Sequence, residues 1–136
     1  SNFSIGVNLF FNLNQHLAKL MKPWSEYNLA IEEIHHTEKK DAPSGTAITL
    51  AQDILPYTDK KTWSLDLTSQ DAVGIKSKRE ADVKGTHKVS YTSKIDNITI
   101  EHEAHSREGF AMGAIIAAEF LIDKKGIFTM KDVLGL

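Results

Sequence analysis

The sequence predicts an α+β domain, with a mixed or antiparallel sheet of about four strands and helices on one face. Three segments, at 27–31, 89–91 and 98–104, alternate apolar and polar side chains, which is typical of half-buried strands. Other segments place apolar residues at helical spacing, and the first of these carries Leu9, Leu13, Leu17 and Leu20. A sheet with helices packed against one face buries both kinds of apolar surface, so the two patterns together predict this architecture.

Length and composition indicate one soluble domain. A chain of 136 residues with 41% hydrophobic and 25% charged side chains has room for one modest core. The net charge of −2 lacks the basic excess of a nucleic-acid-binding protein. Without cysteine, the chain has neither a disulfide framework nor cysteine-ligated zinc, and it fits a reducing compartment. We find no signal peptide and no apolar span of membrane-crossing length, and we expect a cytoplasmic protein with no membrane or nucleic-acid partner.

The first helix is expected over residues 9–21, because Pro23 cannot continue it. Phe10 and Phe11 widen its apolar face, so the helix should cover one side of the sheet. His16 lies near that face, and we interpret it as structural or surface-exposed.

The polar run at residues 33–47 lies between a predicted strand and a predicted helix that reaches Ile54. Such a loop presents free backbone N–H groups and the positive end of the helix dipole. It also carries two imidazoles, an ammonium and two hydroxyls, on His35, His36, Lys39, Ser44 and Thr46. This combination is suited to binding a carboxylate or phosphate and to moving a proton beside it.

Each part of this run also has a purely structural interpretation. Adjacent residues of a strand point to opposite faces, so regular geometry directs only one of His35 and His36 into a given pocket, and the other is then packed or hydrogen-bonded. The charges at 39–41 are typical of a solvated cluster. Residues 43–46 alone form an ordinary turn followed by a capped helix. The complete run is harder to explain in this way than its parts.

As a whole, residues 33–47 resemble the signature of the dihydrodipicolinate reductases, also called 4-hydroxy-tetrahydrodipicolinate reductases, of lysine and diaminopimelate synthesis. Every fixed position of that signature is present, E-x-H-H-x-x-K-x-D-A-P-S-G-T-A. Residues 79–87 resemble the family's R-x-G-x-x-x-G-x-H segment, although Ala81 stands where many members have glycine, which puts the local backbone conformation in question. Residues 107–114 match the family's R-x-x-F-A-x-G-A.

Residues 57–75 are the least patterned segment. Trp63, Leu65 and Leu67 alternate and indicate a possible short strand. We consider two roles for this segment, a long loop that closes over the site and an arm that reaches a neighbouring subunit. The basic run at 76–88 lacks the interleaved aromatic residues that stack on nucleic acid, and it is typical of a solvated face.

A hairpin is expected where the strands at 89–91 and 98–104 flank the turn at Asp96-Asn97. The second strand leads to His102 and His105, which suggest a metal site. Residues three apart on a strand face opposite ways, and the helical zinc motif needs a spacing of four. We therefore predict no metal.

The last helix is expected over residues 114–122, which are apolar nearly all round, as in a buried helix. Lys124, Lys125 and Gly126 suit its C-terminus. We divide the chain into a substrate-binding and oligomerisation domain at residues 1–106 and a C-terminal helical segment at 107–136. In the family that segment returns to the nucleotide-binding domain.

The resemblance implies an NADH- or NADPH-dependent reductase that acts on a ring compound with two carboxylates. It makes His35 the general acid and Lys39 its catalytic partner. The substrate contacts it implies are His36, Lys39, Ser44, Gly45 and Thr46. Because the chain contains no G-x-G-x-x-G motif, we expect a separate N-terminal domain to bind the cofactor. Phe3 and Arg107, near the family's interdomain hinge, are the candidate cofactor contacts in this chain.

The resemblance also implies a homo-oligomer, a tetramer joined through an apolar outer face of the sheet. We expect this chain alone to be inactive as a reductase, because the cofactor domain is not in it. The alternative is a non-catalytic module that binds a dicarboxylate or only assembles oligomers.

Overall fold

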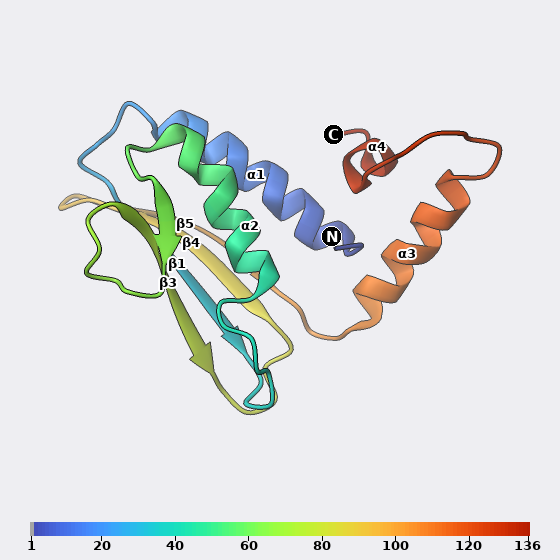
Figure 1. The fold of residues 1–136 in the computed structure, drawn as a ribbon, viewed down its shortest axis with the longest axis horizontal. Coiled ribbons are helices and arrows are strands. Elements are labelled where there is room, and N and C mark those ends of the chain that lie inside the picture. The colour runs from blue at the N-terminus through green and yellow to red at the C-terminus, as the bar shows by residue number, and fades with distance from the viewer. Residues whose placement is uncertain (1) are drawn as a thin grey trace.

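A computed structural model describes residues 2–136, and its central element is a five-stranded mixed sheet (Figure 1). The strands lie in the order β2-β3-β1-β4-β5. Their bounds are Asn28–His35 for β1, Thr62–Ser64 for β2, Ala72–Arg79 for β3, Thr86–Thr92 for β4 and Asn97–Glu103 for β5. β1 pairs in parallel with β3 and antiparallel with β4, and β4 and β5 form the expected hairpin. The α+β class is confirmed, with one strand more than expected.

The sequence pattern did not predict strand β3, because part of this strand belongs to the basic run that we interpreted as a solvated face. Val73 and Ile75 are buried in the core. Lys76 and Lys78 alternate with them and both pair with Glu32 on the open face, at 3.8 and 2.9 Å between nitrogen and oxygen. The lysines therefore belong to a half-buried strand and not to a loop.

Two helices cover one face of the sheet (Figure 1). Helix α1, Ile5–Met21, is capped by Ser4, and helix α2, Gly45–Ile54, is capped by Ser44; each hydroxyl accepts a hydrogen bond from an N–H of the first turn. The buried faces of both helices and the inner face of the sheet form the core, which includes Phe10, Ile31, Leu50, Ile54, Ile75 and Val89. The expectation that the leucine face of α1 covers the sheet was wrong, because Leu9, Leu13 and Leu20 are 47%, 50% and 56% exposed. Full burial of side chains of this size stabilises the fold by about 1.5–3 kcal/mol each. His16 lies on the exposed side of α1.

The open face of the sheet is polar, so the expectation of an apolar outer face was wrong. Besides the pairs of Glu32, it carries an ion pair between Lys88 and Glu101 at 2.8 Å and a hydrogen bond between Thr99 and Ser90 at 3.1 Å. Side chains alternate along each strand, and the apolar ones point to the helices. Most of the outer positions are therefore occupied by charged and hydroxyl residues, with Ala30 and Ile34 of β1 as apolar exceptions.

The segment between α2 and β3 is more regular than its sequence indicates. A 3-10 turn, η1 at Leu55–Tyr57, follows α2, and β2 pairs in parallel with β3, which confirms the possible short strand around Trp63. Lys61 N–H donates to the carbonyl of Asp71, beside the start of β3. This segment therefore lies at the end of the sheet opposite to His35 and does not close over the signature run.

Helix α3, Glu108–Phe120, extends away from the sheet, and the chain then turns back so that α4, Met130–Leu134, lies near α1, where Lys131 donates to Gln15 (Figure 1). The expectation that α3 is buried was wrong, because only Gly113 and Ala117 of this helix are buried among the described residues. Met112 and Ile115 are 57% and 54% exposed. Within residues 2–136, none of the helices combines the length and the apolar character needed to cross a membrane.

Candidate active site

The signature run begins where β1 ends and leads into α2. Because β1 and β3 are parallel, their last residues, His35 and Arg79, lie side by side. β4 starts beside them, and the pairing of β4 with β1 sets His87 opposite Glu33. The cap residue Ser44 brings the positive end of the α2 dipole to the same edge of the sheet. This edge, at the carboxyl ends of parallel strands, is the usual ligand position in α/β sheets.

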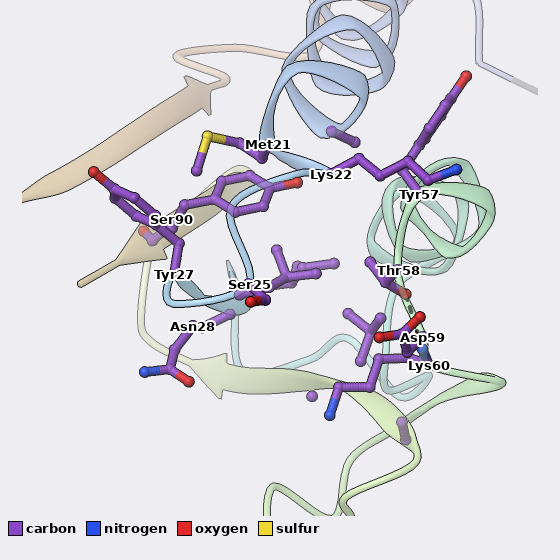
Figure 2. Close-up of a pocket in the computed structure, with 18 of the residues that line it drawn as sticks. Met21, Lys22, Ser25, Tyr27, Asn28, Tyr57, Thr58, Asp59, Lys60 and Ser90 are labelled. Atoms are coloured by element: carbon purple, nitrogen blue, oxygen red, sulfur yellow. Dashed lines mark hydrogen bonds between the residues drawn. The ribbon is translucent and has the colours of Figure 1, made fainter.

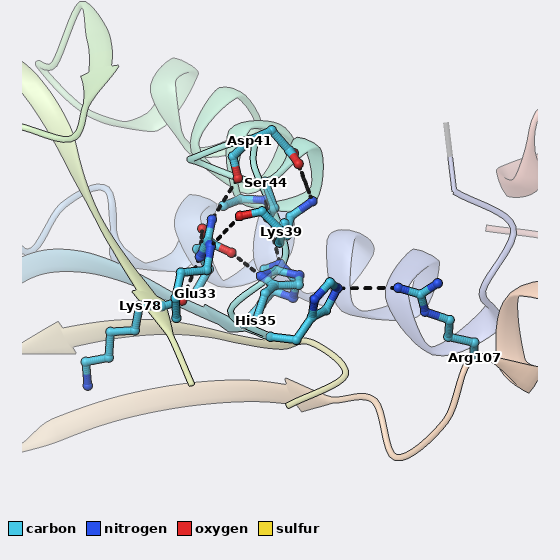
Figure 3. Close-up of polar contacts among 11 residues, drawn as sticks. Glu33, His35, Lys39, Asp41, Ser44, Lys78 and Arg107 are labelled. Carbon is cyan, nitrogen blue, oxygen red and sulfur yellow. Dashed lines mark hydrogen bonds and ion pairs between the residues drawn. The ribbon is translucent and has the colours of Figure 1, made fainter. Parts of the chain in front are cut away.

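Glu33 is the buried charge at the centre of the site. Its side chain is fully buried, its Oε2 contacts Nδ1 of His35, and its Oε1 accepts a hydrogen bond of 3.0 Å from Arg79 (Figure 3). Burial raises the pKa of Glu33, but the contacts with His35, Ser77 and Arg79 outweigh burial and lower the pKa to about 2. Glu33 is therefore ionised at neutral pH.

Arg79 ties the polar loop to the sheet. Besides its bond to Glu33, the guanidinium donates to the backbone carbonyls of Lys78, Asp41 and Lys39, at 2.6, 2.7 and 3.4 Å. The planar fork of five donors is what allows one side chain to satisfy partners on both segments. The loop conformation therefore depends on Arg79.

His87 lies on the other side of His35, with 5.0 Å between the ring centroids. Its Nε2 is 2.9 Å from the hydroxyl of Ser44, which also accepts the N–H of Ala47 at 3.2 Å. Burial, reinforced by the neighbouring His35, lowers the pKa of His87 to about 3. His87 is therefore neutral at neutral pH, and its contact with Ser44 stabilises the start of α2.

His35 is held between these groups, and 12% of its side chain is exposed. Nδ1 faces Glu33, whereas Nε2 lies beside Gly85, where a Cβ would come within 3.2 Å. Within residues 2–136, Nε2 has no hydrogen-bond partner. The second ring nitrogen is thus not engaged by a group of residues 2–136.

His36 points away from His35, as expected for adjacent strand residues. Its Nε2 lies 3.4 Å from Nη2 of Arg107, the residue that precedes α3 (Figure 3). Both side chains line a cavity of about 540 Å³, together with Thr37, Glu38, Ala81, Asp82, Lys84, His105 and Ser106. Phe3 is 47% exposed, and its carbonyl packs against Gly113 of α3.

The remaining predicted residues line the start of α2. The Lys39 ammonium bonds both carboxylate oxygens of Asp41, at 2.8 and 2.9 Å, and this contact lowers the pKa of Asp41. Lys39 is also near enough to lower the pKa of His87. Gly45 and Thr46 are the first two residues of α2, where N–H groups lack helical partners, and no atom lies within 4 Å of a Cβ built on Gly45.

The structure therefore gathers His35, Lys39, Ser44, Gly45 and Thr46 around the end of β1 and the start of α2. It places His36 with Arg107 on the side that faces α3. Glu33, Arg79 and His87 were not predicted as site residues, although all three lie in the quoted motifs. The spacing of Glu33 and His35, two residues apart on one strand, was the available signal for their contact.

The donor atoms of Glu33, His35 and His87 lie within 4.8 Å of one another, a set that zinc also uses. The sequence pattern suggested metal ligands only at His102 and His105 and did not indicate this cluster. Here the carboxylate already has two partners, and the positive charge of Arg79 opposes a second cation. The ion pairs of Glu33 with His35 and Arg79 therefore account for the buried carboxylate without a metal ion.

The two histidines considered as metal ligands diverge. The ring of His102 packs against Phe10 of α1, with 5.9 Å between the ring centroids, and His105 borders the cavity beside His36. β5 ends at Glu103, so His105 lies outside the strand and the two rings are separated by the turn that follows it. The backbone question raised at Ala81 is also answered, because the positive φ of 64° falls on the next residue, Asp82.

A larger cavity, of about 860 Å³, lies at the opposite end of the sheet (Figure 2). Lys22, Tyr27, Tyr57 and Lys60 are among its lining residues. No predicted site residue borders it. The buried ion pair, the neutral imidazole and the exposed helix start all lie at the other end, so we locate the candidate site there.

The sequence of this chain matches known proteins over nearly its whole length. A family model described as "Dihydrodipicolinate reductase, C-terminus" matches residues 6–134. The 4-hydroxy-tetrahydrodipicolinate reductases of Christiangramia forsetii and Methanosarcina acetivorans are 60% and 40% identical to this chain over 99% of its length. The chain spans 57% and 52% of those two proteins.

A solved structure shares the fold. It is titled "Dipicolinate bound Dihydrodipicolinate reductase from Paenisporosarcina sp. TG-14" and superposes with a TM-score of 0.68. The match covers 94% of this chain and 50% of that one, at 23% identity. With the signature run placed at the end of β1 and the family match extending over nearly every residue, this chain belongs to the dihydrodipicolinate reductase family, where it corresponds to the C-terminal part.

Proposed function

We propose that this chain supplies the substrate-binding and proton-donating part of a 4-hydroxy-tetrahydrodipicolinate reductase of lysine and diaminopimelate synthesis. The observation that carries the proposal is that His35 and the start of α2 share one edge of the sheet, where the ring of His87 contacts His35 and its Nε2 lies 2.9 Å from the hydroxyl of Ser44. A proton donor and an anion-binding helix start at one sheet edge suit a substrate that carries carboxylates.

The proposed reaction converts 4-hydroxy-tetrahydrodipicolinate to tetrahydrodipicolinate. One hydride and one proton are added, and one water leaves. The hydride would come from NADH or NADPH. The loop that precedes α2 carries Pro43 and Ser44 in place of a glycine-rich phosphate-binding turn, so it does not fit the cofactor's phosphates. We therefore assign cofactor binding to a separate domain, with Phe3 and Arg107 as candidate contacts from this chain.

The substrate would be held by its carboxylates. The N–H groups of Gly45 and Thr46 would bind one of them, in the space that the missing side chain of Gly45 leaves open. The hydroxyl of Ser44 and the ammonium of Lys39 would add donors, although Ser44 is shared with His87 and Lys39 with Asp41. His36 would contact the substrate from the opposite side.

His35 would donate the proton through Nε2, the ring nitrogen with no partner within residues 2–136. Lys39 would assist as a nearby positive charge that stabilises the negative charge developing on the substrate. General acid catalysis of this kind contributes about 10²- to 10⁴-fold to turnover.

The rest of the chain would support assembly. We propose that residues 1–106 bind substrate and that residues 107–136 pack against the nucleotide-binding domain, which would cover Met112 and Ile115 of α3. We further propose a cytoplasmic homotetramer joined through the open face of the sheet. Since that face is polar, its contacts would be hydrogen bonds and ion pairs more than apolar burial.

Calorimetric titration of residues 1–136 with pyridine-2,6-dicarboxylate tests the binding half of this proposal. Lys39→Ala should weaken binding by about 1.5–3 kcal/mol, because it removes a charge-assisted hydrogen bond. His35→Ala should change binding less, since a general acid acts mainly as the transition state forms. Lys40→Ala, at the exposed neighbouring position, is the matched control and should bind like the wild type.

Equal affinities of wild type and Lys39→Ala would remove the signature run as the substrate site. In the two-domain protein, His35→Ala should cost about 10²- to 10⁴-fold in turnover. Dicarboxylate binding combined with unchanged turnover in that variant would favour the alternative, in which this chain only binds a dicarboxylate or assembles oligomers.

A further inference from the structure

We infer that Glu33 is a positioning residue for His35, which holds the imidazole with Nδ1–H toward its own carboxylate and leaves Nε2 as the atom that transfers the proton. The inference rests on the proposed role of His35 as general acid. It adds a residue to the site that acts without touching the substrate.

The two carboxylate oxygens of Glu33 have separate partners. Oε1 accepts from Arg79 at 3.0 Å, and Oε2 contacts Nδ1 of His35 (Figure 3). An ionised carboxylate can only accept hydrogen bonds, so Nδ1 must carry a proton in this contact. With its side chain fully buried, Glu33 has no water to exchange for these partners. The tautomer of His35 therefore follows from the geometry of Glu33.

The other neighbours of His35 leave Nε2 free. His87 directs its Nε2 to Ser44 at 2.9 Å, so that nitrogen does not engage His35. Gly85 is buried beside Nε2 of His35 and lacks the side chain that would crowd it, since a Cβ there would come within 3.2 Å. One ring nitrogen is thus anchored and the other is open.

The proton balance of the proposed step follows from this arrangement. The N–H bond at Nε2 of the imidazolium breaks, the proton goes to the substrate, and the electron pair stays on Nε2. Nδ1 keeps its proton and its contact with Glu33, which remains an anion throughout. His35 is left neutral in the tautomer that accepts the next proton at Nε2.

A purely structural role is the competing explanation, in which Glu33 only neutralises Arg79. That role requires only one carboxylate oxygen of Glu33 and is compatible with either tautomer of His35. The tautomer is therefore the measurement that separates the two roles. ¹⁵N NMR of the imidazole rings of residues 1–136, recorded with a chelator to exclude bound metal and at a pH where the rings are neutral, reports it directly.

In the wild type we expect His35 as the Nδ1–H tautomer. In Glu33→Gln, the amide oxygen should turn to Arg79, which only donates, so the amide NH₂ faces Nδ1 and His35 changes to the Nε2–H tautomer. Glu32→Gln is the matched control, because the adjacent Glu32 points to the open face and contacts Lys76 and Lys78. It should leave His35 as in the wild type.

The Nε2–H tautomer in the wild type would overturn the inference, and so would an unchanged tautomer in Glu33→Gln. The wild-type measurement needs no variant, so the test survives if Glu33→Gln does not fold. In the two-domain protein, Glu33→Gln should lower kcat by about 10²-fold or more with KM changed less than threefold, a split typical of lost orientation of a catalytic histidine. A wild-type protein without reductase activity would defeat the proposed function and leave the tautomer result standing.

Discussion

Because Gly45 has no side chain, a substitution at this position tests ligand binding separately from the stability of the fold. Its Cβ position is empty in this structure, and it lies in the first turn of α2. Gly45→Ala should leave stability unchanged or raise it by up to about 1 kcal/mol, because alanine favours a helix and restricts the unfolded chain. The same methyl would occupy the proposed carboxylate position and should weaken pyridine-2,6-dicarboxylate binding at least tenfold. Urea unfolding and calorimetry measure the two effects, and unchanged affinity would show that the ligand does not sit over Gly45.

Among single residues, the signature run at 33–47 identified the predicted site residues but not the residues of other strands that contact them. His35, Ser44 and Lys39 could be named from the sequence because they lie in one continuous run. Their partners Arg79 and His87 come from β3 and β4, and only the register that aligns those strands with β1 brings them near. Register depends on how the sheet packs, which a local pattern does not specify.

At the scale of elements, α3 is anchored through Gly113. A Cβ at this position would overlap the carbonyl of Phe3, so Gly113→Ala should force the helix away from the N-terminal segment. Amide hydrogen exchange in α3 should then become at least tenfold faster. Gly109→Ala is the matched control in the same helix, where a Cβ meets Oγ of Ser4 at 3.8 Å, an ordinary contact, and exchange should stay equal or slow. Equal exchange in the two variants would show that α3 is not held at Gly113.

The elements differ in how far the sequence predicted them. β1 and the β4–β5 hairpin were expected because their apolar residues alternate, and α1 because its leucines follow the helical period. β3 was missed because Gly74, Lys76 and Lys78 occupy its outer positions, which leaves only its inner face to show a pattern. For α3 the apolar character was visible, but burial depends on what covers a helix, and no described segment covers most of this one.

At the scale of the whole molecule, two buried groups make stability depend on pH. The pKa of His87 is lowered, mainly by burial, from 6.5 to about 3, and that of Glu33 is lowered from 4.5 to about 2 by contacts that outweigh burial. In both cases the unfolded chain takes up the proton more readily than the folded one. Each of the two groups therefore contributes its full stabilisation of the fold above the pKa that it has in the unfolded chain. This stabilisation is lost as pH falls toward the pKa of the group in the folded protein.

Between pH 6.5 and 4.5 the loss comes mainly from His87, because the unfolded pKa of Glu33 lies at the lower end of this interval. A group that is protonated in the unfolded chain but not in the folded protein lowers the free energy of unfolding by up to about 1.4 kcal/mol for each unit that the pH falls. Over this interval the free energy of unfolding should therefore fall by about 2 kcal/mol. Urea unfolding of residues 1–136 across this interval measures the slope. His87→Gln should flatten most of it, with a remainder from His102, whose pKa burial also lowers. His16→Gln, on the exposed side of α1, should keep the wild-type slope, and an equally steep slope in His87→Gln would show that His87 is not held neutral in the folded protein.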